Sequence, residues 1–363
     1  MLSLFSFNGQ ERCGTNTITE YLINSSPKYK VARDKSNIQT IEWIKNNQNT
    51  TKNSIINIPV VVHVVWNTDN PEQNISDAQI QYQIDVLNND YRRQNIDQIN
   101  TESAWLINAA DCEIEFCLAK VDPNGLATNG IIRVETNHGT FDTDSDIHTS
   151  SSGGSNDWPN HDYLNLWVCN LGDNLLGYAT PPSSSIQDGD GVVINYKNFG
   201  NSPNPPYNKG RTATHEIGHW LNLEHLWGSF GFCGDDQVND TPKQESWTYN
   251  CPGFPSNPNS CSTANSNGDM FQNYMDYTND ACMNLFTNDQ KTRMRAAISL
   301  YRPNMLNHNL CSELTNLLNF DIQNKKIVKI IDILGKEIKN PLSKSTSIYI
   351  YSDGSVEKIV TIN

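Results

Sequence analysis

The sequence THEIGHWLNLEHLWG, residues 214–228, contains three histidines and a glutamate at regular intervals. His215 and His219 are four residues apart, so a helix would place both imidazoles on one face, where they can bind one metal ion. Glu216 follows the first histidine, and its carboxylate can take a proton from water that the metal activates. Zinc fits a site of neutral imidazoles with one open coordination position.

The third histidine requires a turn. His225 lies six residues after His219, and on a continuous helix it would point roughly 240° around the axis, at about 100° per residue. The helix must therefore end between them, and a residue with φ > 0 allows this. Asn tolerates that conformation best after Gly, and Asn222 stands at the required place. Two alternatives stay open: Asn222 is exposed on a continuous helix, or Glu224 or another carboxylate is the third ligand.

Composition narrows the class of protein. The chain has 363 residues, enough for one sizeable core and an appendage or two. Its net charge of -14 would repel nucleic acid and anionic membranes, and no stretch approaches the roughly 20 apolar residues of a membrane span. Nine cysteines favour disulfides and an extracellular location. The first residues form too short an apolar run for a signal peptide, so we expect any leader to be missing from this sequence.

Hydrophobic patterns predict an alternation of strands and helices between a polar N-terminal part and a β-rich tail. Residues 55–67 form a dense β-branched run, typical of a buried strand. A helix follows, with a capping-box signal at Ser76 and Gln79, and a closing helix spans 287–302 between Thr287 and Pro303. Further strands are predicted at 113–121, 130–135, 164–171 and 191–196.

The histidine motif resembles that of the metzincin metalloendopeptidases, H-E-x-x-H-x-x-G-x-x-H, and departs only at the glycine, where Asn222 stands. NYMDY, residues 273–277, resembles the methionine turn of the same enzymes. The resemblance implies that Met275 underlies the zinc site and that Tyr277 lies near the zinc and stabilises the transition state. For Met275, plain core packing is the alternative.

HLWGSFGFCGDDQVNDTPKQ and NYMDYTNDACMNLFTNDQ narrow the resemblance to the pappalysin family, in particular its secreted bacterial members, over most of residues 55–302. The resemblance implies an α+β catalytic domain over residues 53–311. This domain would contain a twisted, mostly parallel sheet with a backing helix and an active-site helix, followed by an irregular C-terminal subdomain. One antiparallel edge strand above the cleft could pair with an extended substrate.

Residues 228–282 are rich in Gly, Pro, Asn and Asp, and so long a loop needs staples or metals to stay ordered. The resemblance implies a structural Ca²⁺ site built from the Asp236 and Thr241 side chains and the Val238 carbonyl. A solvated acidic turn is the alternative.

The resemblance also implies the disulfides Cys233–Cys261 and Cys251–Cys282. Two further pairs are possible, Cys112–Cys117 and Cys169–Cys311, although no geometric argument supports either.

ERCGT, residues 11–15, places a thiol beside a predicted zinc enzyme. A thiolate could fill the fourth zinc position and keep the enzyme latent. Latent pappalysins carry an R-C-G motif in the prosegment, which Arg12-Cys13-Gly14 matches. The resemblance thus implies a prosegment over residues 1–52, removed by cleavage between residues 28 and 55, with Lys45 and Lys52 as candidate sites. The alternative for Cys13 is a half-cystine or an inert thiol.

The tail, residues 312–363, alternates strand patterns with turn signals at Leu334-Gly335 and Asp353-Gly354, which predicts a small all-β appendage. From about residue 320 it resembles the sorting domain of the type IX secretion system of Bacteroidetes. That resemblance implies the secretion machinery as a partner. A carbohydrate- or surface-binding β module is the alternative.

These patterns predict a secreted, monomeric zinc endopeptidase, made as a latent zymogen, that acts on protein or peptide substrates and binds Zn²⁺ and Ca²⁺. A non-catalytic secreted surface or adhesion protein with a protease-like domain is the alternative, and the intact Glu216 argues against it.

Some pappalysins prefer a basic residue after the cut and carry an acid just before the cysteine that follows the methionine turn. Here Ala281 has that place and Asp280 precedes it, which argues against a basic preference.

Overall fold

The structure is a computed structural model. It describes the chain apart from residues 1–10, 48–53, 144–146, 173–174, 184–188, 229–231, 259, 263–264, 314–326, 340–345, 353, 355 and 361–363. The candidate cleavage residue Lys52 and the turn residue Asp353 therefore lie outside the described residues.

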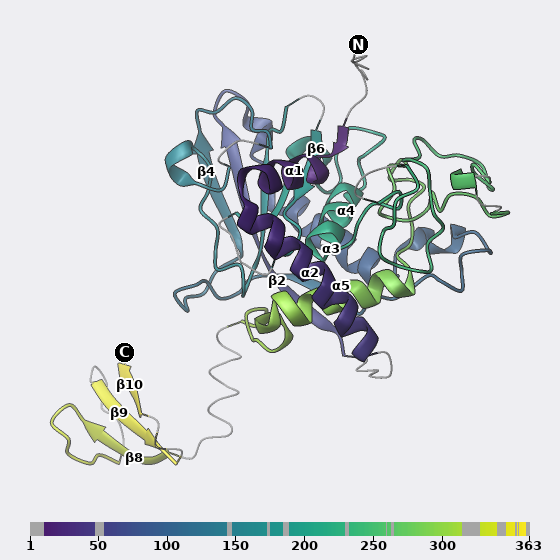
Figure 1. The fold of residues 1–363 in the computed structure, drawn as a ribbon. Helices are drawn as coiled ribbons and strands as arrows, with labels where there is room; N and C mark the ends of the chain where they lie inside the picture. The colour runs from purple at the N-terminus through teal and green to yellow at the C-terminus, as the bar shows by residue number, and fades with distance from the viewer. Residues whose placement is uncertain are drawn as a thin grey trace.

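A seven-stranded sheet forms the centre of the molecule (Figure 1), with the strand order β1-β6-β7-β5-β2-β3 and with β4 also paired to β2. All neighbouring strands are parallel except β6 and β7, which are antiparallel. The strands are β1 (Glu11–Cys13), β2 (Ile56–Asn67), β3 (Ile114–Leu118), β4 (Ile131–Thr136), β5 (Leu164–Cys169), β6 (Leu175–Ala179) and β7 (Gly191–Asn195). The predicted mostly parallel sheet is confirmed, and β1 and β6 are the strands that the sequence patterns missed.

The β-branched run forms β2, the longest strand, which is buried on both faces between β5 and the β3–β4 pair. Val60, Val62 and Val64 face the larger core, under the active-site helix, whereas Val65 packs into a second core with Trp167 on the opposite face. A continuous apolar run, rather than alternation, is what burial on both faces of a parallel strand requires.

The described residues form five α-helices beside the sheet: α1 (Thr15–Ser25), α2 (Pro27–Asn46), α3 (Asp77–Tyr91), α4 (Arg211–Trp220) and α5 (Asn288–Tyr301). The predicted caps are present, since the Ser76 side chain accepts the N–H of Gln79 and Thr287 forms a capping box with Gln290. Short 3₁₀ helices lie at Pro71–Gln73, Ile96–Asn100, Ser150–Ser152, Tyr196–Asn198, Ser260–Ser262 and Pro303–Leu306. None of the described helices is long and apolar enough to cross a membrane.

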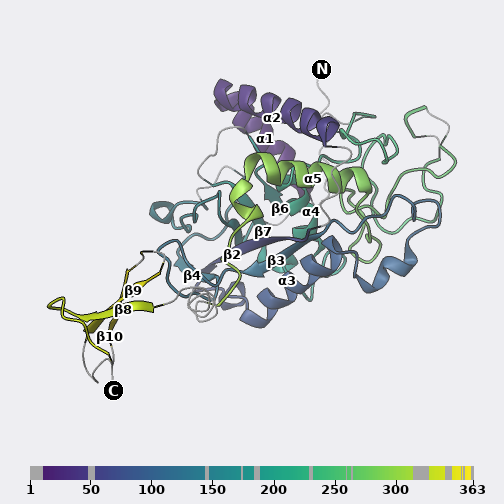
Figure 2. The same cartoon turned by 90° about the horizontal axis from the view of Figure 1, so that it is seen from below.

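The N-terminal helices lie over the catalytic part of the chain. Helix α2 packs along α5, and α1 packs on α2 and β6 (Figures 1 and 2). On the other side of the active-site helix, α3 packs against α4 and β3. Residues from both ends of the chain therefore meet around α4.

Three disulfides link segments of the chain. Cys233–Cys261 and Cys251–Cys282 staple the irregular region, as the resemblance implies. The third bond joins Cys117 to Cys311, across 194 residues.

The predictions of Cys112–Cys117 and Cys169–Cys311 pairs are wrong, because Cys112 and Cys169 are free thiols buried in the two cores. Cys112 packs with Ile114 and Phe116, whereas Cys117 is only partly buried and can reach the returning chain at Cys311.

The tail forms a separate three-stranded antiparallel sheet in the order β10-β9-β8, with β8 at Ile327–Asp332, β9 at Thr346–Tyr351 and β10 at Val356–Val360. The predicted turn after β8 is present, with Gly335 at φ 83° and the Asp332 carboxylate accepting the N–H groups of Leu334 and Lys336. The predicted all-β appendage is confirmed. It lies apart from the larger sheet in both views (Figures 1 and 2).

Candidate metal centre

Helix α4 ends where the histidine spacing requires it to end. Asn222 adopts φ 75°, in the left-handed region. Its N–H donates to the His219 carbonyl at 2.8 Å, and the N–H of Leu223 donates to the Gly218 carbonyl at 2.9 Å. These two bonds are those of a Schellman motif, which satisfies the last carbonyls of a helix. The alternative of an exposed Asn222 on a continuous helix is wrong, because the helix stops and Asn222 is buried.

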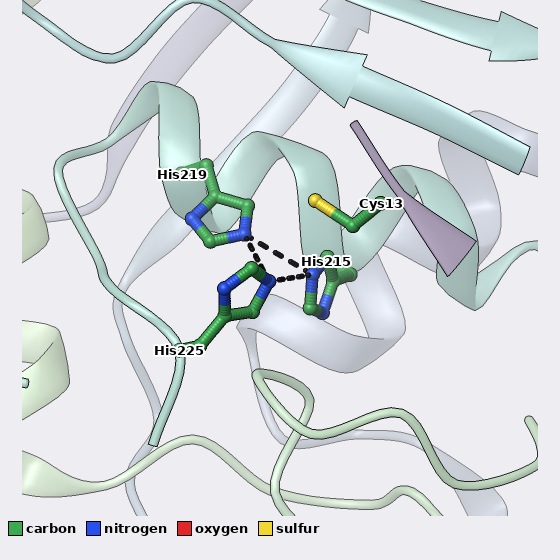
Figure 3. A group of neighbouring side chains, drawn as sticks. All are labelled: Cys13, His215, His219 and His225. Atoms are coloured by element: carbon green, nitrogen blue, oxygen red, sulfur yellow. Dashed lines mark hydrogen bonds between the residues drawn. The ribbon is translucent and has the colours of Figure 1, made fainter. Parts of the chain in front are cut away.

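The turn brings the three histidines together (Figure 3). The Nε2 atoms of His215 and His219 are 3.1 Å apart, those of His219 and His225 are 3.1 Å apart, and those of His215 and His225 are 3.3 Å apart. A tetrahedral zinc ion with Zn–N distances of about 2.0–2.1 Å separates two ligand nitrogens by about 3.3–3.4 Å. The spacing of the three nitrogens therefore suits one zinc ion.

The protonation state of the rings agrees with metal binding. The Nδ1 atom of His215 lies 2.7 Å from the Tyr274 carbonyl, and Nδ1 of His219 lies 2.8 Å from the Leu223 carbonyl. A carbonyl only accepts, so each Nδ1 carries the proton and each Nε2 presents a lone pair. Burial lowers the pKa of His219 to about 4 and lowers the pKa values of His215 and His225 well below the ordinary value. Two of the rings thus direct a lone pair into the cluster, and burial favours the neutral form of all three, which suits a site for a cation.

Cys13 reaches this cluster from the N-terminal strand β1. Its Sγ atom and the three histidine ligand atoms all lie within 4.8 Å of one another, and in Figure 3 the sulfur lies beside the three rings. Among the residues that the structure describes, this is the one group of three or more His, Cys, Asp or Glu side chains close enough to share a metal ion. The strand holds Cys13 in place through parallel pairing with β6, where Cys13 lies opposite Gly177.

Glu216 is buried beside the histidines, and two side chains from the N-terminal part of the chain contact it. The Cys13 thiol lies 3.2 Å from Oε2 of Glu216, and the Thr15 hydroxyl donates to the same oxygen at 2.9 Å. Burial raises the pKa of Glu216 to about 8, while the bonds from Thr15 and Cys13 oppose that shift. The sequence patterns missed Thr15, because only the folded chain brings its hydroxyl across 201 residues to Glu216.

The methionine turn lies against the active-site helix. A Cβ atom at Gly218 would come within 2.6 Å of the Met275 sulfur, so Met275 packs directly against the segment between the two helical histidines. The Tyr277 ring meets the His225 ring edge to face at 5.1 Å and lies 5.7 Å from the His215 ring. Trp227, which the sequence patterns did not single out, stacks on His225 at 4.5 Å with an interplanar angle of 8°.

Comparison with known proteins identifies the family. Residues 147–299 match the profile of peptidase family M43, described as pregnancy-associated plasma protein-A. The chain is 30% identical over 262 residues to an extracellular metalloprotease of Verticillium alfalfae, covering 70% of this chain and 80% of that protein. It is 34% identical over 261 residues to an extracellular metalloprotease of Uncinocarpus reesii, covering 68% of this chain and 78% of that protein. The chain belongs to the pappalysin family of metalloendopeptidases.

Solved structures agree with this assignment. A Tannerella forsythia promirolysin mutant matches with a TM-score of 0.68 and 46% identity, over 82% of this chain and 97% of that one. Mature mirolysin from the same organism, in complex with a cleaved peptide, matches with a TM-score of 0.63 and 49% identity, over 70% of this chain and 99% of that one. The pappalysin chain described here is therefore an α+β metalloendopeptidase of the metzincin type.

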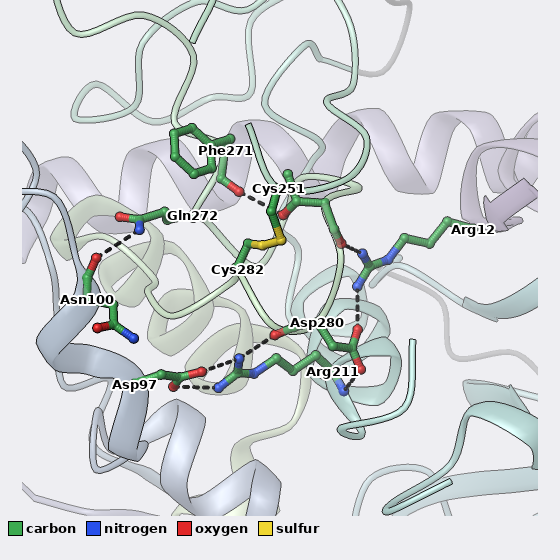
Figure 4. The surroundings of a disulfide bond; sticks show 10 residues. Arg12, Asp97, Asn100, Arg211, Cys251, Phe271, Gln272, Asp280 and Cys282 are labelled. Carbon is green, nitrogen blue, oxygen red and sulfur yellow. Dashed lines mark hydrogen bonds and ion pairs between the residues drawn. A yellow bond between two sulfur atoms is a disulfide. The ribbon is translucent and has the colours of Figure 1, made fainter. Parts of the chain in front are cut away.

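A buried ion pair between Arg12 and Asp280 lies near the Cys251–Cys282 disulfide of this pappalysin (Figure 4). The Arg12 guanidinium lies 3.4 Å from the Asp280 carboxylate and over the Tyr207 ring, 4.8 Å from its centroid. It also donates to the Thr278 carbonyl. Asp280 is fixed by the N–H groups of Lys209 at 2.8 Å and Arg211 at 3.3 Å. The Asp280 carboxylate thus lies one position before Ala281, which is the place where the family pattern has its acid.

In the predicted calcium loop Asp236 is buried, whereas Asp235 and Asn239 on either side of it are exposed. The Thr241 hydroxyl donates to the Asp236 carboxylate at 2.7 Å, and the N–H of Val238 lies 3.4 Å from its other oxygen. Burial raises the pKa of Asp236 to about 7. A buried carboxylate is costly unless it is well paired, and this turn supplies one hydroxyl and one N–H.

Proposed function

We propose that the chain is a secreted zinc endopeptidase made as a latent precursor, in which His215, His219 and His225 hold the zinc ion. The convergence of three neutral imidazole nitrogens, 3.1–3.3 Å apart, supports this most strongly. The names of the extracellular relatives and the disulfides support secretion. The substrates are proteins or peptides, and the enzyme acts as a monomer.

In this proposal Glu216 is the general base and Tyr277 assists at the scissile carbonyl. Bound zinc supplies Lewis acidity, which polarises a peptide carbonyl and acidifies water. Glu216 takes the proton of the attacking water and passes it to the leaving amine. The Tyr277 hydroxyl donates a hydrogen bond to the oxygen that becomes negative, and Met275 supports the ligand geometry from below. Tyr277→Phe should lower kcat at unchanged zinc content, and an unchanged kcat would exclude this role.

We assign residues 1–52 as the prosegment ahead of the catalytic domain (53–311) and the tail (312–363), and latency follows from the position of its described residues, 11–47. Strand β1 covers β6, the antiparallel edge of the sheet, and places Cys13 at the metal centre. A thiolate is a strong zinc ligand, so Cys13 would take the fourth zinc position. After the prosegment leaves, β6 can pair with an extended substrate. Lys45, in the last turn of α2, is exposed and can be cut.

Replacing the switch cysteine tests latency. In the full-length chain, Cys13→Ala is expected to raise the cleavage rate before any processing, because nothing then replaces water at the fourth zinc position. Cleavage of a quenched peptide, measured in the first minutes while gels show the chain intact, gives the rate. Wild-type latency in Cys13→Ala would contradict the switch. Cys112→Ala, which removes the other free thiol of the larger core, is the matched control and should stay latent.

Contrary to the expectation drawn from Ala281, we infer a preference for Arg or Lys in the residue after the cut. The fixed Asp280 carboxylate already holds a guanidinium in the latent chain, and it becomes available to a substrate side chain when the prosegment leaves. Profiling the mature enzyme with a peptide library should therefore show enrichment of basic residues immediately after the cleaved bond. A profile with no basic enrichment there would contradict this assignment.

We also propose that Ca²⁺ binds at Asp236, Val238 and Thr241, where a cation would compensate the buried carboxylate. Added Ca²⁺ should raise the Tm of wild type and not that of Asp236→Asn; equal shifts would exclude this site.

The tail serves as a type IX sorting domain recognised by the secretion machinery. Deleting residues 312–363 should leave peptide cleavage unchanged and retain the protein inside the producing cell. Normal export of the deleted chain would contradict this role and leave the binding-module alternative.

A further inference from the structure

The side chain of Asn222 has contacts that the turn itself does not need. A glycine, which the metzincin motif has at this place, would adopt φ 75° at least as readily. Asn222 is fully buried, and both polar atoms of its side chain bond to the prosegment helix α2. Its Oδ1 accepts from the Arg33 guanidinium at 2.5 Å, and its Nδ2 donates to the Thr40 hydroxyl at 3.1 Å. The partners lie 189 and 182 residues earlier in the chain.

The hydrogen bonds described for the buried Arg33 guanidinium run to neutral groups rather than to carboxylates. Its guanidinium is buried and also donates to the Pro182 carbonyl at 3.2 Å and to the Asn37 side chain at 3.3 Å. Hydrogen bonds from an ionised donor are stronger than neutral ones, and a buried charge left without a partner is costly. The contact between Arg33 and Asn222 therefore carries a large share of the specificity of α2 docking.

Helix α5 completes the surface beneath α2. The Arg293 guanidinium donates to the Asn222 carbonyl at 2.6 Å and to the Asn37 side chain at 3.0 Å. The Tyr301 hydroxyl donates to the Ser36 carbonyl at 2.6 Å and lies 3.2 Å from the Thr40 hydroxyl. Asn222, Arg293 and Tyr301, here called the α2-docking surface, thus join the zinc-ligand turn to the prosegment without involving Cys13.

We propose that the α2-docking surface recognises the prosegment through Arg33 and Thr40, and that it keeps the prosegment bound as a separate inhibitory peptide after the chain is cut between α2 and β2. The asparagine in place of the motif glycine makes this recognition possible. This inference rests on the proposed latency. It adds the polar contact between α2 and the α2-docking surface to the contact of Cys13 with the zinc site. Cleavage of the connecting segment alone then leaves the enzyme inhibited until the prosegment dissociates or is degraded.

The test uses the full-length chain with Glu216→Gln in every variant, so that no chain digests itself. A recognition sequence for a site-specific protease, inserted between Asn47 and Ser54, is cut by that protease, and size exclusion over a dilution series measures how tightly the prosegment stays bound. The cut reference chain is expected to elute as a complex. Arg33→Met should weaken binding on the order of tenfold or more, and Thr40→Val should weaken it less. Lys35→Met removes an exposed charge from the same helix and should change nothing.

The Asn222→Gly variant tests the Arg33–Asn222 contact by itself, because it removes the side chain that accepts from Arg33. In that background, Arg33→Met is expected to weaken binding by less than about threefold, because its main partner is already absent. The same tenfold loss in both backgrounds, or prompt dissociation of the cut reference chain, would overturn the proposal. Co-elution requires neither zinc nor activity of the enzyme itself, so failure here is distinguishable from failure of the latency proposal, which Cys13→Ala tests by activity.

Discussion

The Glu216→Ala variant, freed of its prosegment, should keep one zinc ion per chain and lose on the order of 10²–10⁴-fold of its activity toward casein or gelatin. Zinc should remain because Glu216 is not among the clustered ligand atoms. Activity should fall because the buried Glu216 carboxylate, next to the histidines, is the proposed acceptor for the proton of the attacking water. Metal analysis and initial cleavage rates on the same preparation measure both quantities.

Glu224→Ala is the matched control for this experiment. It removes a second glutamate from the same segment, but the Glu224 carboxylate lies 3.9 Å from the Arg293 guanidinium rather than among the histidine nitrogens. The control should retain most of the activity. If wild type binds zinc and Glu216→Ala cleaves equally fast, the catalytic assignment is wrong. If wild type itself cleaves nothing after prosegment removal, the surface or adhesion protein alternative gains support.

His225→Ala should lose zinc and, with it, all measurable cleavage. Removing an outer-shell partner of a metal ligand already costs about 10–100-fold in affinity, and loss of a direct ligand should cost more. Competition with a zinc-binding dye measures the affinity of the prosegment-free chain, because Cys13 is then absent.

The glutamate hypothesis predicts the opposite pattern. If Glu224 were the third ligand, His225→Ala would keep zinc at wild-type affinity and Glu224→Ala would lose it. We expect Glu224→Ala to bind zinc as wild type does. A circular dichroism spectrum should show that His225→Ala is folded, so that zinc loss reports on the site and not on unfolding.

Rules that relate neighbouring residues in the sequence predicted much of the metal centre and of the fold around it. His225, six residues after His219, cannot lie on the same helix if both bind one ion, and this spacing, with the tolerance of Asn for φ > 0, located the turn at Asn222, which has φ 75°. The β-branched run gave the central strand β2, and side-chain caps gave the starts of α3 and α5. Each of these features is determined by residues that lie close to one another in the sequence.

The features that sequence patterns missed depend on distant partners. Strand β1 has three residues and exists through its pairing with β6, which itself is short and contains a glycine. The Cys117–Cys311 bond joins residues 194 positions apart, so a pairing inferred from closeness in the sequence, such as Cys112–Cys117, is wrong. The same holds for Thr15 on Glu216 and for Arg12 on Asp280, since nothing near either prosegment residue in the sequence specifies its partner.

Zinc K-edge X-ray absorption of the intact latent chain tests the central claim most directly. The account predicts three nitrogen ligands at about 2.0–2.1 Å and one sulfur ligand at about 2.3 Å, with the sulfur lost in Cys13→Ala and after removal of the prosegment. A zinc ion with no sulfur neighbour in the latent chain, or with fewer than three imidazole nitrogens in any form, would contradict it.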